Sequence, residues 1–228
     1  MGAVDGPGLR CVVFMQGCDL RCIYCHNPET WDRAGGKEIC VEELVSKIDR
    51  YRNYIQKDGG VTVSGGEALM QWQFVAELFR KLKVMGYHTA LDTSGVGDLQ
   101  GAKAVLQYTD LVIADMKFPK ASDFRRYCHG DIQEVFDFLA LTAKMGIPLW
   151  IRQVIVPGIN DTKENILALV ETVSCYPNLV KVELLPFRKL CESKYKELGI
   201  PFLLKDTPEC SGETIAALEK ELSIALKK

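Results

Sequence analysis

With 228 residues, the chain is long enough to bury a substantial core within one domain. Apolar residues make up 47% and charged residues 25%, proportions typical of a globular protein, and no apolar run reaches the ~20 residues of a membrane helix. The net charge of −2 gives no electrostatic reason to expect nucleic acid or an anionic membrane as a partner. Because no charged-then-apolar leader opens the sequence, we expect a cytoplasmic protein.

Short β-type runs alternate with longer amphipathic segments along the chain. The runs predict strands at Cys11–Met15, Val61–Ser64, His88–Asp92, Leu111–Asp115, Trp150–Val156 and Val180–Leu184. The amphipathic segments predict helices at Val41–Gln56, Gln71–Met85, Asp98–Tyr108, Ile132–Lys144, Lys163–Ser174 and Gly212–Leu226. Gly86 and Gly146 stand where two of these helices should end.

This alternation predicts an α/β fold with a parallel sheet and outer helices. Six βα units fall short of the eight that close a (β/α)8 barrel, so we expect a partial (β/α)6 TIM-like barrel. A doubly wound sheet is the competing architecture. Because no linker or low-complexity tract divides the chain, we predict a single domain over residues 1–228.

The carboxyl ends of the predicted strands are unusually polar. The residues at these ends are Gly65, Gly66 and Glu67 after the second strand, Asp92 and Thr93 at the third, and Asp115 and Lys117 at the fourth. In the fifth strand, Arg152 alternates with apolar neighbours and should point inward with Trp150 and Val154. Since a charge inside a barrel is costly unless it is paired or bound to a ligand, these strands predict a polar binding site. A structural ion-pair network is the alternative.

Three of the nine cysteines, Cys18, Cys22 and Cys25, are spaced as C-x3-C-x2-C and followed directly by His26. A structural Cys3His zinc site is one interpretation, although adjacent residues such as Cys25 and His26 rarely reach one tetrahedral metal. Covalent haem is another, because CIYCH matches C-x-x-C-H, but that attachment belongs to exported proteins. A 4Fe–4S cluster with three thiolates and one open iron is the interpretation that the spacing favours.

The other six cysteines are scattered, and only Cys40 lies between the triplet and the second predicted strand. We therefore expect a single iron–sulfur cluster. A remote cysteine as its fourth ligand is an alternative that the sequence leaves open.

The cysteine triplet, in a loop after the first strand, resembles the signature of the radical S-adenosylmethionine (SAM) superfamily. More closely, the chain resembles the glycyl radical enzyme activases of the pyruvate formate-lyase type. The matching stretches, in the family's order, are VDGPGLR at Val4–Arg10, QGCDLRCIYCHNPETW at Gln16–Trp31, GGKE at Gly35–Glu38, VTVSGGEALMQ at Val61–Gln71, LDTSG, DMK, WIRQVIVPGIND at Trp150–Asp161 and VELLPFRKL at Val182–Leu190. Together they extend over nearly the whole chain.

The resemblance implies an oxidoreductase that cleaves SAM reductively at a 4Fe–4S cluster and abstracts a hydrogen atom from a glycine of pyruvate formate-lyase. It also implies a flavodoxin-like or ferredoxin-like electron donor, and we expect a monomer. The alternatives are activation of another glycyl radical enzyme and a radical SAM enzyme with a small-molecule substrate. From another class, a non-catalytic metal module is the last alternative.

Matching positions imply roles for individual residues. The resemblance assigns the iron–sulfur cluster to Cys18, Cys22 and Cys25. It assigns SAM contacts to Tyr24, His26, Gly65, Gly66, Glu67, Asp115, Lys117, Arg152 and Arg188. Arg188 stands where family members often carry a histidine near adenine, so its role departs from the usual pattern. Asp92, Thr93 and Asp115 match a monovalent-cation site beside SAM, and Asp5 matches a residue that meets the substrate protein.

Overall fold

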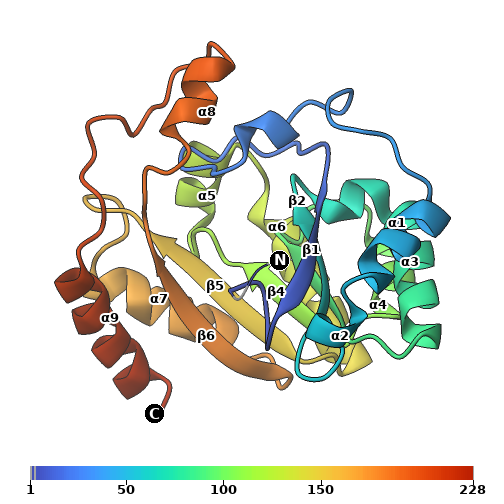
Figure 1. Ribbon diagram of the computed structural model, residues 1–228. Coiled ribbons are helices and arrows are strands. Elements are labelled where there is room, and N and C mark those ends of the chain that lie inside the picture. The colour runs from blue at the N-terminus through green and yellow to red at the C-terminus, as the bar shows by residue number, and fades with distance from the viewer. Residues whose placement is uncertain (1, 3, 228) are drawn as a thin grey trace.

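The computed structural model describes residue 2 and residues 4–227, so residues 1, 3 and 228 of the predicted domain lie outside the description. Its parallel strands form one sheet in the order β1-β2-β3-β4-β5-β6 (Figure 1). They are β1 (Arg10–Met15), β2 (Gly60–Gly65), β3 (Thr89–Thr93), β4 (Leu111–Asp115), β5 (Leu149–Ile155) and β6 (Leu179–Pro186). Because each strand pairs with the next along the chain, the partial-barrel prediction is confirmed and the doubly wound alternative is wrong.

The helices lie around the outside of the sheet (Figure 1). They are α1 (Val41–Asp49), α2 (Arg52–Ile55), α3 (Trp72–Val84), α4 (Leu99–Leu106), α5 (Ala121–Cys128), α6 (Ile132–Met145), α7 (Lys163–Val173), α8 (Glu192–Glu197) and α9 (Gly212–Ala225), with 3-10 turns η1 (Pro28–Thr30) and η2 (Ala68–Gln71). The predicted helix Val41–Gln56 is broken by a turn at residues 50–51, and α5 and α8 were not predicted. Among the described residues, no helix is long and apolar enough to cross a membrane.

Capping residues set several helix boundaries. Asp98, Asp131 and Ser211 accept hydrogen bonds from backbone N–H groups in the first turns of α4, α6 and α9. Gly146 ends α6 in the left-handed conformation with φ 67°, as its position in the sequence predicts. These local signals explain why most helix ends could be placed from the sequence.

Residues of β2 alternate between the two faces of the sheet, and this alternation positions the site. Val61 and Val63 are fully buried in the main hydrophobic core. Burial of such a side chain stabilises the fold by about 1.5–3 kcal/mol. Thr62 and Ser64 face the barrel interior, where the Ser64 hydroxyl donates to Asp92 at 2.7 Å.

Arg10, at the start of β1, is fully buried at the amino-terminal end of the sheet. Its guanidinium donates to the Val61 carbonyl at 2.7 Å, to the Thr62 hydroxyl at 2.5 Å and to the Pro7 carbonyl at 3.2 Å. Burial among these neutral groups lowers its pKa to about 10. Thr62 in turn donates to the Asp5 carbonyl at 2.7 Å. These hydrogen bonds therefore hold residues 5–7, which precede β1, against the amino-terminal part of the sheet.

We predict that Asp110→Asn lowers the free energy of unfolding by roughly 1 kcal/mol at neutral pH and has little effect in acid. Burial alone would raise the pKa of Asp110, but hydrogen bonds from Lys83 at 2.5 Å and from the Thr89 N–H at 2.9 Å outweigh it and lower the pKa. The contribution is therefore present above the unfolded pKa of about 3.9 and is lost as the pH falls through the folded value.

Urea unfolding of the wild type and the Asp110 variant at neutral pH and near pH 3 measures this difference. The exposed Asp206 provides the control, because its conversion to asparagine should leave stability unchanged at both pH values. An Asp110→Asn effect of the same size at both pH values would contradict the prediction.

Candidate active site

A cavity of about 250 Å³ opens where the carboxyl ends of the strands meet the loop after β1. We call residues 16–31 the cysteine loop. The cavity is lined by most of the predicted residues: Cys18, Cys22, Cys25, Tyr24, His26, Gly65, Gly66, Asp92, Thr93, Asp115, Lys117 and Arg152. The structure thus brings together side chains from the cysteine loop and from four successive strand ends. Glu67, Arg188 and Asp5 do not line this cavity.

Of the three cysteines of the loop, Cys22 is buried, and Cys18 and Cys25 are partly buried. Burial raises the pKa of Cys18 to about 12 and that of Cys25 to about 11. The pKa of Cys22 is raised further, first by a hydrogen bond with the Cys128 thiol and then by burial. Because a metal binds the thiolate, loading of this site must release protons.

The donor set fits an iron–sulfur cluster. Among the described residues, no three His, Cys, Asp or Glu side chains form a group that could hold one metal ion. A 4Fe–4S cluster takes one protein ligand on each iron, so its ligands stand further apart than those of a single ion. Three cysteine thiols around one cavity are compatible with that requirement.

Backbone hydrogen bonds hold the first part of the cysteine loop. The Gly17 N–H donates to the Thr30 carbonyl at 2.7 Å, which closes the loop at its base. Further along, the Arg21 N–H donates to the Cys128 carbonyl at 2.9 Å and the Ile23 N–H to the Tyr127 carbonyl at 3.0 Å. Cys22 is therefore fixed between two bonds to the end of α5.

Gly65, which ends β2, and Gly66, which follows it, allow this loop to approach the sheet closely. Gly65 has φ 116°, and a β-carbon on Gly66 would lie 2.3 Å from the Gly17 carbonyl oxygen. The Gly66 N–H instead donates to the Met15 carbonyl at 2.9 Å. Larger residues here would push β2 away from the loop that carries Cys18.

The Glu67 carboxylate is fully engaged by the protein itself. One of its oxygens accepts from the Leu69 N–H at 3.0 Å and from the Thr93 hydroxyl at 2.6 Å. The other accepts from the Ser94 N–H at 2.8 Å and from the Ser94 hydroxyl at 2.5 Å. Glu67 therefore ties η2 to the end of β3, and its direct contact with SAM stays a prediction.

Charged side chains on the cavity wall are paired. Arg152 donates to Asp92 at 2.6 Å and lies 3.8 Å from Asp115, and Lys117 donates to Asp115 at 3.0 Å. Burial alone would lower the pKa of Arg152, but Asp92 and Asp115 outweigh it and raise the pKa. The pKa of Lys117 is likewise raised by Asp115 against the effect of burial. Both carboxylates are therefore engaged with cations of the protein, and the monovalent-cation site stays a prediction.

Two buried polar atoms on the cavity wall have no hydrogen-bond partner among the described residues: the Tyr24 hydroxyl and Arg152 Nε. Unpaired buried donors are rare in folded proteins because each carries a desolvation cost. Their place beside the cysteines fits a cavity that binds a polar ligand.

The predicted residues outside the cavity have other partners. The Arg188 guanidinium donates to the Cys210 carbonyl at 2.9 Å and lies 3.5 Å from Glu209. The Arg188 carbonyl accepts a hydrogen bond from His26 Nε2 at 2.9 Å, so Arg188 reaches the site through its backbone. Asp5 lies next to Val4, whose carbonyl accepts from Arg152 at 3.4 Å, so the Asp5 segment borders the cavity.

Sequence reasoning did not assign several residues of the cavity wall: Leu20, Asn27, Trp31, Ser64, Ser94, Val154, Leu185 and Pro186. Ser64 and Ser94 lie next to predicted residues at strand ends, so the strand-end argument could have included them. Leu185 and Pro186 end β6, but apolar side chains gave no signal of chemistry.

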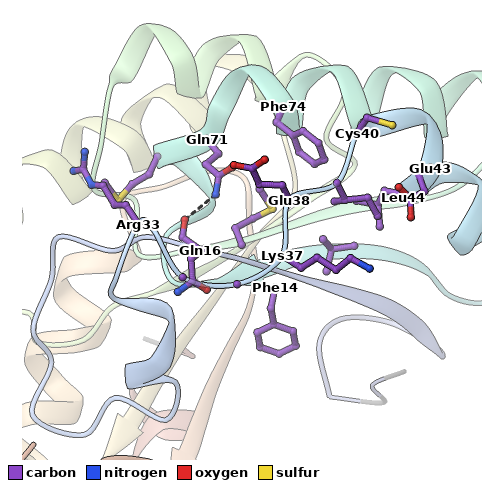
Figure 2. A pocket seen from close by; sticks show the side chains of 16 residues that line it. Phe14, Gln16, Arg33, Lys37, Glu38, Cys40, Glu43, Leu44, Gln71 and Phe74 are labelled. Carbon is purple, nitrogen blue, oxygen red and sulfur yellow. Dashed lines mark hydrogen bonds between the residues drawn. The ribbon is translucent and has the colours of Figure 1, made fainter. Parts of the chain in front are cut away.

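A larger cavity, of about 840 Å³, lies beside the end of β1, with Phe14, Lys37 and Leu44 in its wall (Figure 2). Its wall includes Val13 and Phe74, and the Gln71 amide donates to the Gln16 carbonyl at 2.8 Å on its rim. Of the cysteines, Cys40 alone lines it among the described residues. The candidate site is nevertheless the smaller cavity, because the three clustered cysteines and the buried charged side chains line that one.

Comparison with known proteins separates the remaining interpretations. A family model for a 4Fe-4S single cluster domain matches residues 4–129. The pyruvate formate-lyase-activating enzyme of Clostridium pasteurianum is 43% identical over 228 residues, which are 100% of this chain and 95% of that protein. The chain belongs to the pyruvate formate-lyase-activating enzyme family. The enzyme of the same name from Staphylococcus epidermidis is 40% identical over 94% of this chain and 89% of its own length.

Solved structures share the fold of this chain. A domain of a pyruvate-formate lyase-activating enzyme from Bacteroides vulgatus aligns with TM-score 0.60 at 21% identity, over 73% of this chain and 94% of that one. A radical SAM methyltransferase from Sphaerobacter thermophilus aligns with TM-score 0.66 at 16% identity, over 94% of this chain and 63% of that one. These likenesses confirm the predicted fold, and the family confirms the predicted radical SAM oxidoreductase class.

Proposed function

We propose that this family member activates pyruvate formate-lyase by generating a glycyl radical on it, with a 4Fe–4S cluster and SAM as cofactors. One observation carries the proposal: three cysteine thiols, Cys18, Cys22 and Cys25, line a single cavity together with buried paired charges. Three thiolates leave one iron of a 4Fe–4S cluster open to another ligand. When bound, the cluster would supply the electron for reductive cleavage of SAM, the chemistry that formation of a glycyl radical requires.

The chain's own residues bind and orient the cofactors. Arg152 Nε, 3.8 Å from Asp115, is a buried donor with no hydrogen-bond partner among the described residues and is suited to the SAM carboxylate. Lys117 supplies a second positive charge on the same wall. The Tyr24 hydroxyl is the other unpaired donor, and the ring of His26 is oriented by the Arg188 carbonyl. Gly65 allows the end of β2 to approach β1 closely, because a β-carbon there would lie 2.2 Å from the Met15 nitrogen.

The resemblance to the family implies three further roles for residues in or near the cavity. Asp92, Thr93 and Asp115 would hold a monovalent cation only if the carboxylates share it with Arg152 and Lys117. Asp5, on the segment that borders the cavity, would meet the glycine loop of the substrate protein. Arg188 would contact adenine only after leaving the Cys210 carbonyl.

The proposal also covers the domain organisation, the oligomeric state, the location and the electron donor. Residues 1–228 would act as a single radical SAM domain, as a monomer in the cytoplasm. All nine cysteines are free thiols, which suits a reducing compartment. Because iron–sulfur potentials extend down to about −700 mV, a low-potential flavodoxin-like or ferredoxin-like protein is a suitable electron donor.

The function is tested with anaerobically reconstituted protein. About four irons per chain are expected, and addition of reductant, SAM and pyruvate formate-lyase should produce the electron paramagnetic resonance signal of a glycyl radical. Stoichiometric zinc in place of iron would contradict the iron–sulfur assignment. A signal with another glycyl radical enzyme, and none with pyruvate formate-lyase, would contradict the proposed substrate alone.

Cys22→Ala is expected to abolish iron–sulfur cluster binding and to reduce 5′-deoxyadenosine release to background, because the site loses its most buried sulfur ligand. Iron content and nucleoside release, measured on the same reconstituted sample, check this. Cys175→Ala is the matched control, since Cys175 is exposed and lies outside the cavity. Wild-type release from the Cys22 variant would remove Cys22 from the ligand set.

A further inference from the structure

The segment between β6 and α9 reaches across the molecule to the cysteine loop. We call residues 187–210 the clasp loop; α8 lies within it, beside η1 and the blue loop that follows β1 (Figure 1). The clasp loop is closed at its base, because the Cys210 N–H donates to the Phe187 carbonyl at 3.1 Å and the Arg188 side chain to the Cys210 carbonyl at 2.9 Å. A closed base gives α8 a fixed position over the cysteine loop.

Lys194 on α8 makes three contacts with the residues that follow Cys25. Its ammonium donates to the His26 carbonyl at 3.1 Å, to the Asn27 side-chain oxygen at 2.9 Å and to Glu29 at 2.5 Å. A lysine ammonium has three N–H donors, so this geometry uses all of them. It is unusual for a lysine that is partly exposed to solvent to direct all three of its N–H donors at protein atoms.

Tyr195, the next residue on α8, contacts the third cysteine of the site directly. Its hydroxyl donates to the Cys25 carbonyl at 3.1 Å. Its ring, which is only 4% exposed, packs edge-on against Trp31 at 6.0 Å and beside Phe202 at 4.8 Å. The hydroxyl is therefore held in place by aromatic packing on both sides.

The three cysteines are thus held in different ways. Backbone hydrogen bonds to the end of α5 flank Cys22, and the Cys18 N–H donates to the Trp31 carbonyl at 3.4 Å. For Cys25, the backbone N–H donates to the Cys22 carbonyl at 3.0 Å, but the carbonyls of Cys25 and His26 accept from side chains of α8. Among the described residues, Cys25 is the one of the three whose backbone carbonyl accepts a hydrogen bond from a side chain far away in the sequence.

We propose that Lys194 and Tyr195 are positioning residues that fix the backbone from Cys25 to Glu29 and so hold the Cys25 ligand on the iron–sulfur cluster. This inference rests on the proposed function, since it requires a cluster at the three cysteines. Loosening the Cys25 carbonyl frees the ligand to leave its iron and lets a chelator reach the cluster. The Lys194 charge also lies close to the ligand backbone, where a positive charge favours the reduced cluster.

The test compares Lys194→Met, Tyr195→Phe and the double variant with the wild type, all reconstituted anaerobically. The rate of iron transfer to a ferrous chelator should rise about tenfold in Lys194→Met and by a smaller factor in Tyr195→Phe. The midpoint potential, followed by electron paramagnetic resonance, should fall in Lys194→Met. Lys194→Arg should restore the midpoint potential, because it keeps the charge, but the iron-release rate only in part, because a planar guanidinium cannot make the three contacts of one ammonium.

Lys196→Met is the matched control, because Lys196 lies exposed on the same helix. Its iron-release rate and potential should equal those of the wild type. Wild-type rates and potentials in Lys194→Met and in Tyr195→Phe would overturn the inference while leaving the proposed function intact. A wild-type protein that binds no iron would instead overturn the proposed function. Should Lys194→Met fold poorly, Tyr195→Phe decides, because it removes a single oxygen atom.

Discussion

Replacing Arg152 with methionine is expected to lower the free energy of unfolding by about 3–5 kcal/mol, because Asp92 would remain buried without its counter-ion. The two side chains are bonded at 2.6 Å and are 9% and 10% exposed, so water cannot take over the role of Arg152. Chemical unfolding of the protein without cofactors isolates this effect from any loss of ligand binding. We also expect SAM binding to be lost, since Arg152 contributes an unpaired donor to the cavity.

The double variant Arg152→Met/Asp92→Asn separates stability from function. Removing both charges should recover most of the lost stability, because a neutral pair no longer carries the cost of a buried charge. SAM binding to the reconstituted protein should stay absent, as measured by calorimetric titration. Arg33→Met is the control: its pair with Asp19 is 68% exposed on both sides and should contribute less than about 1 kcal/mol. Equal losses at Arg152 and Arg33 would contradict the assignment of a buried pair.

The order of elements could be predicted because each depends on local pattern. Alternating β runs and helical segments, with glycines such as Gly146 at helix ends, gave the parallel sheet and its outer helices. The helix α8 was missed because it is six residues long and only Tyr195 is buried in it. The short helix α5 was missed for the same reason, with only Phe124 and Cys128 buried.

The candidate site was predictable where it depends on topology. Asp92, Asp115 and Arg152 meet because the carboxyl ends of parallel strands share one edge, whatever the loops between them do. The position of the Arg188 side chain was not predictable, because it depends on the path of the clasp loop. The contact of Lys194 with Asn27 joins residues 167 positions apart, a separation at which no periodicity or spacing carries information.

Glu67→Gln is expected to lower the free energy of unfolding by about 3–5 kcal/mol, because the amide cannot satisfy the donors around it. Each carboxylate oxygen accepts from one backbone N–H, that of Leu69 or that of Ser94, and from one hydroxyl. Whichever way the glutamine amide is turned, its NH2 group faces a backbone N–H that cannot rotate away. Chemical unfolding measures the loss. The Glu67 N–H donates to the Gly17 carbonyl at 2.7 Å, at the base of the cysteine loop, so a shift of residue 67 should also lower the iron content.

Glu43→Gln is the matched control for this change. Glu43 pairs with Lys47 on the surface and is 52% exposed, so the substitution should alter stability by less than about 0.5 kcal/mol. Burial raises the pKa of Glu67, while the four donors around it favour the charged form. Full wild-type stability of Glu67→Gln would therefore mean that the side chain is already protonated in the folded protein, because only a neutral group can be exchanged for an amide without cost. The carboxylate would then not be the acceptor that joins η2 to β3.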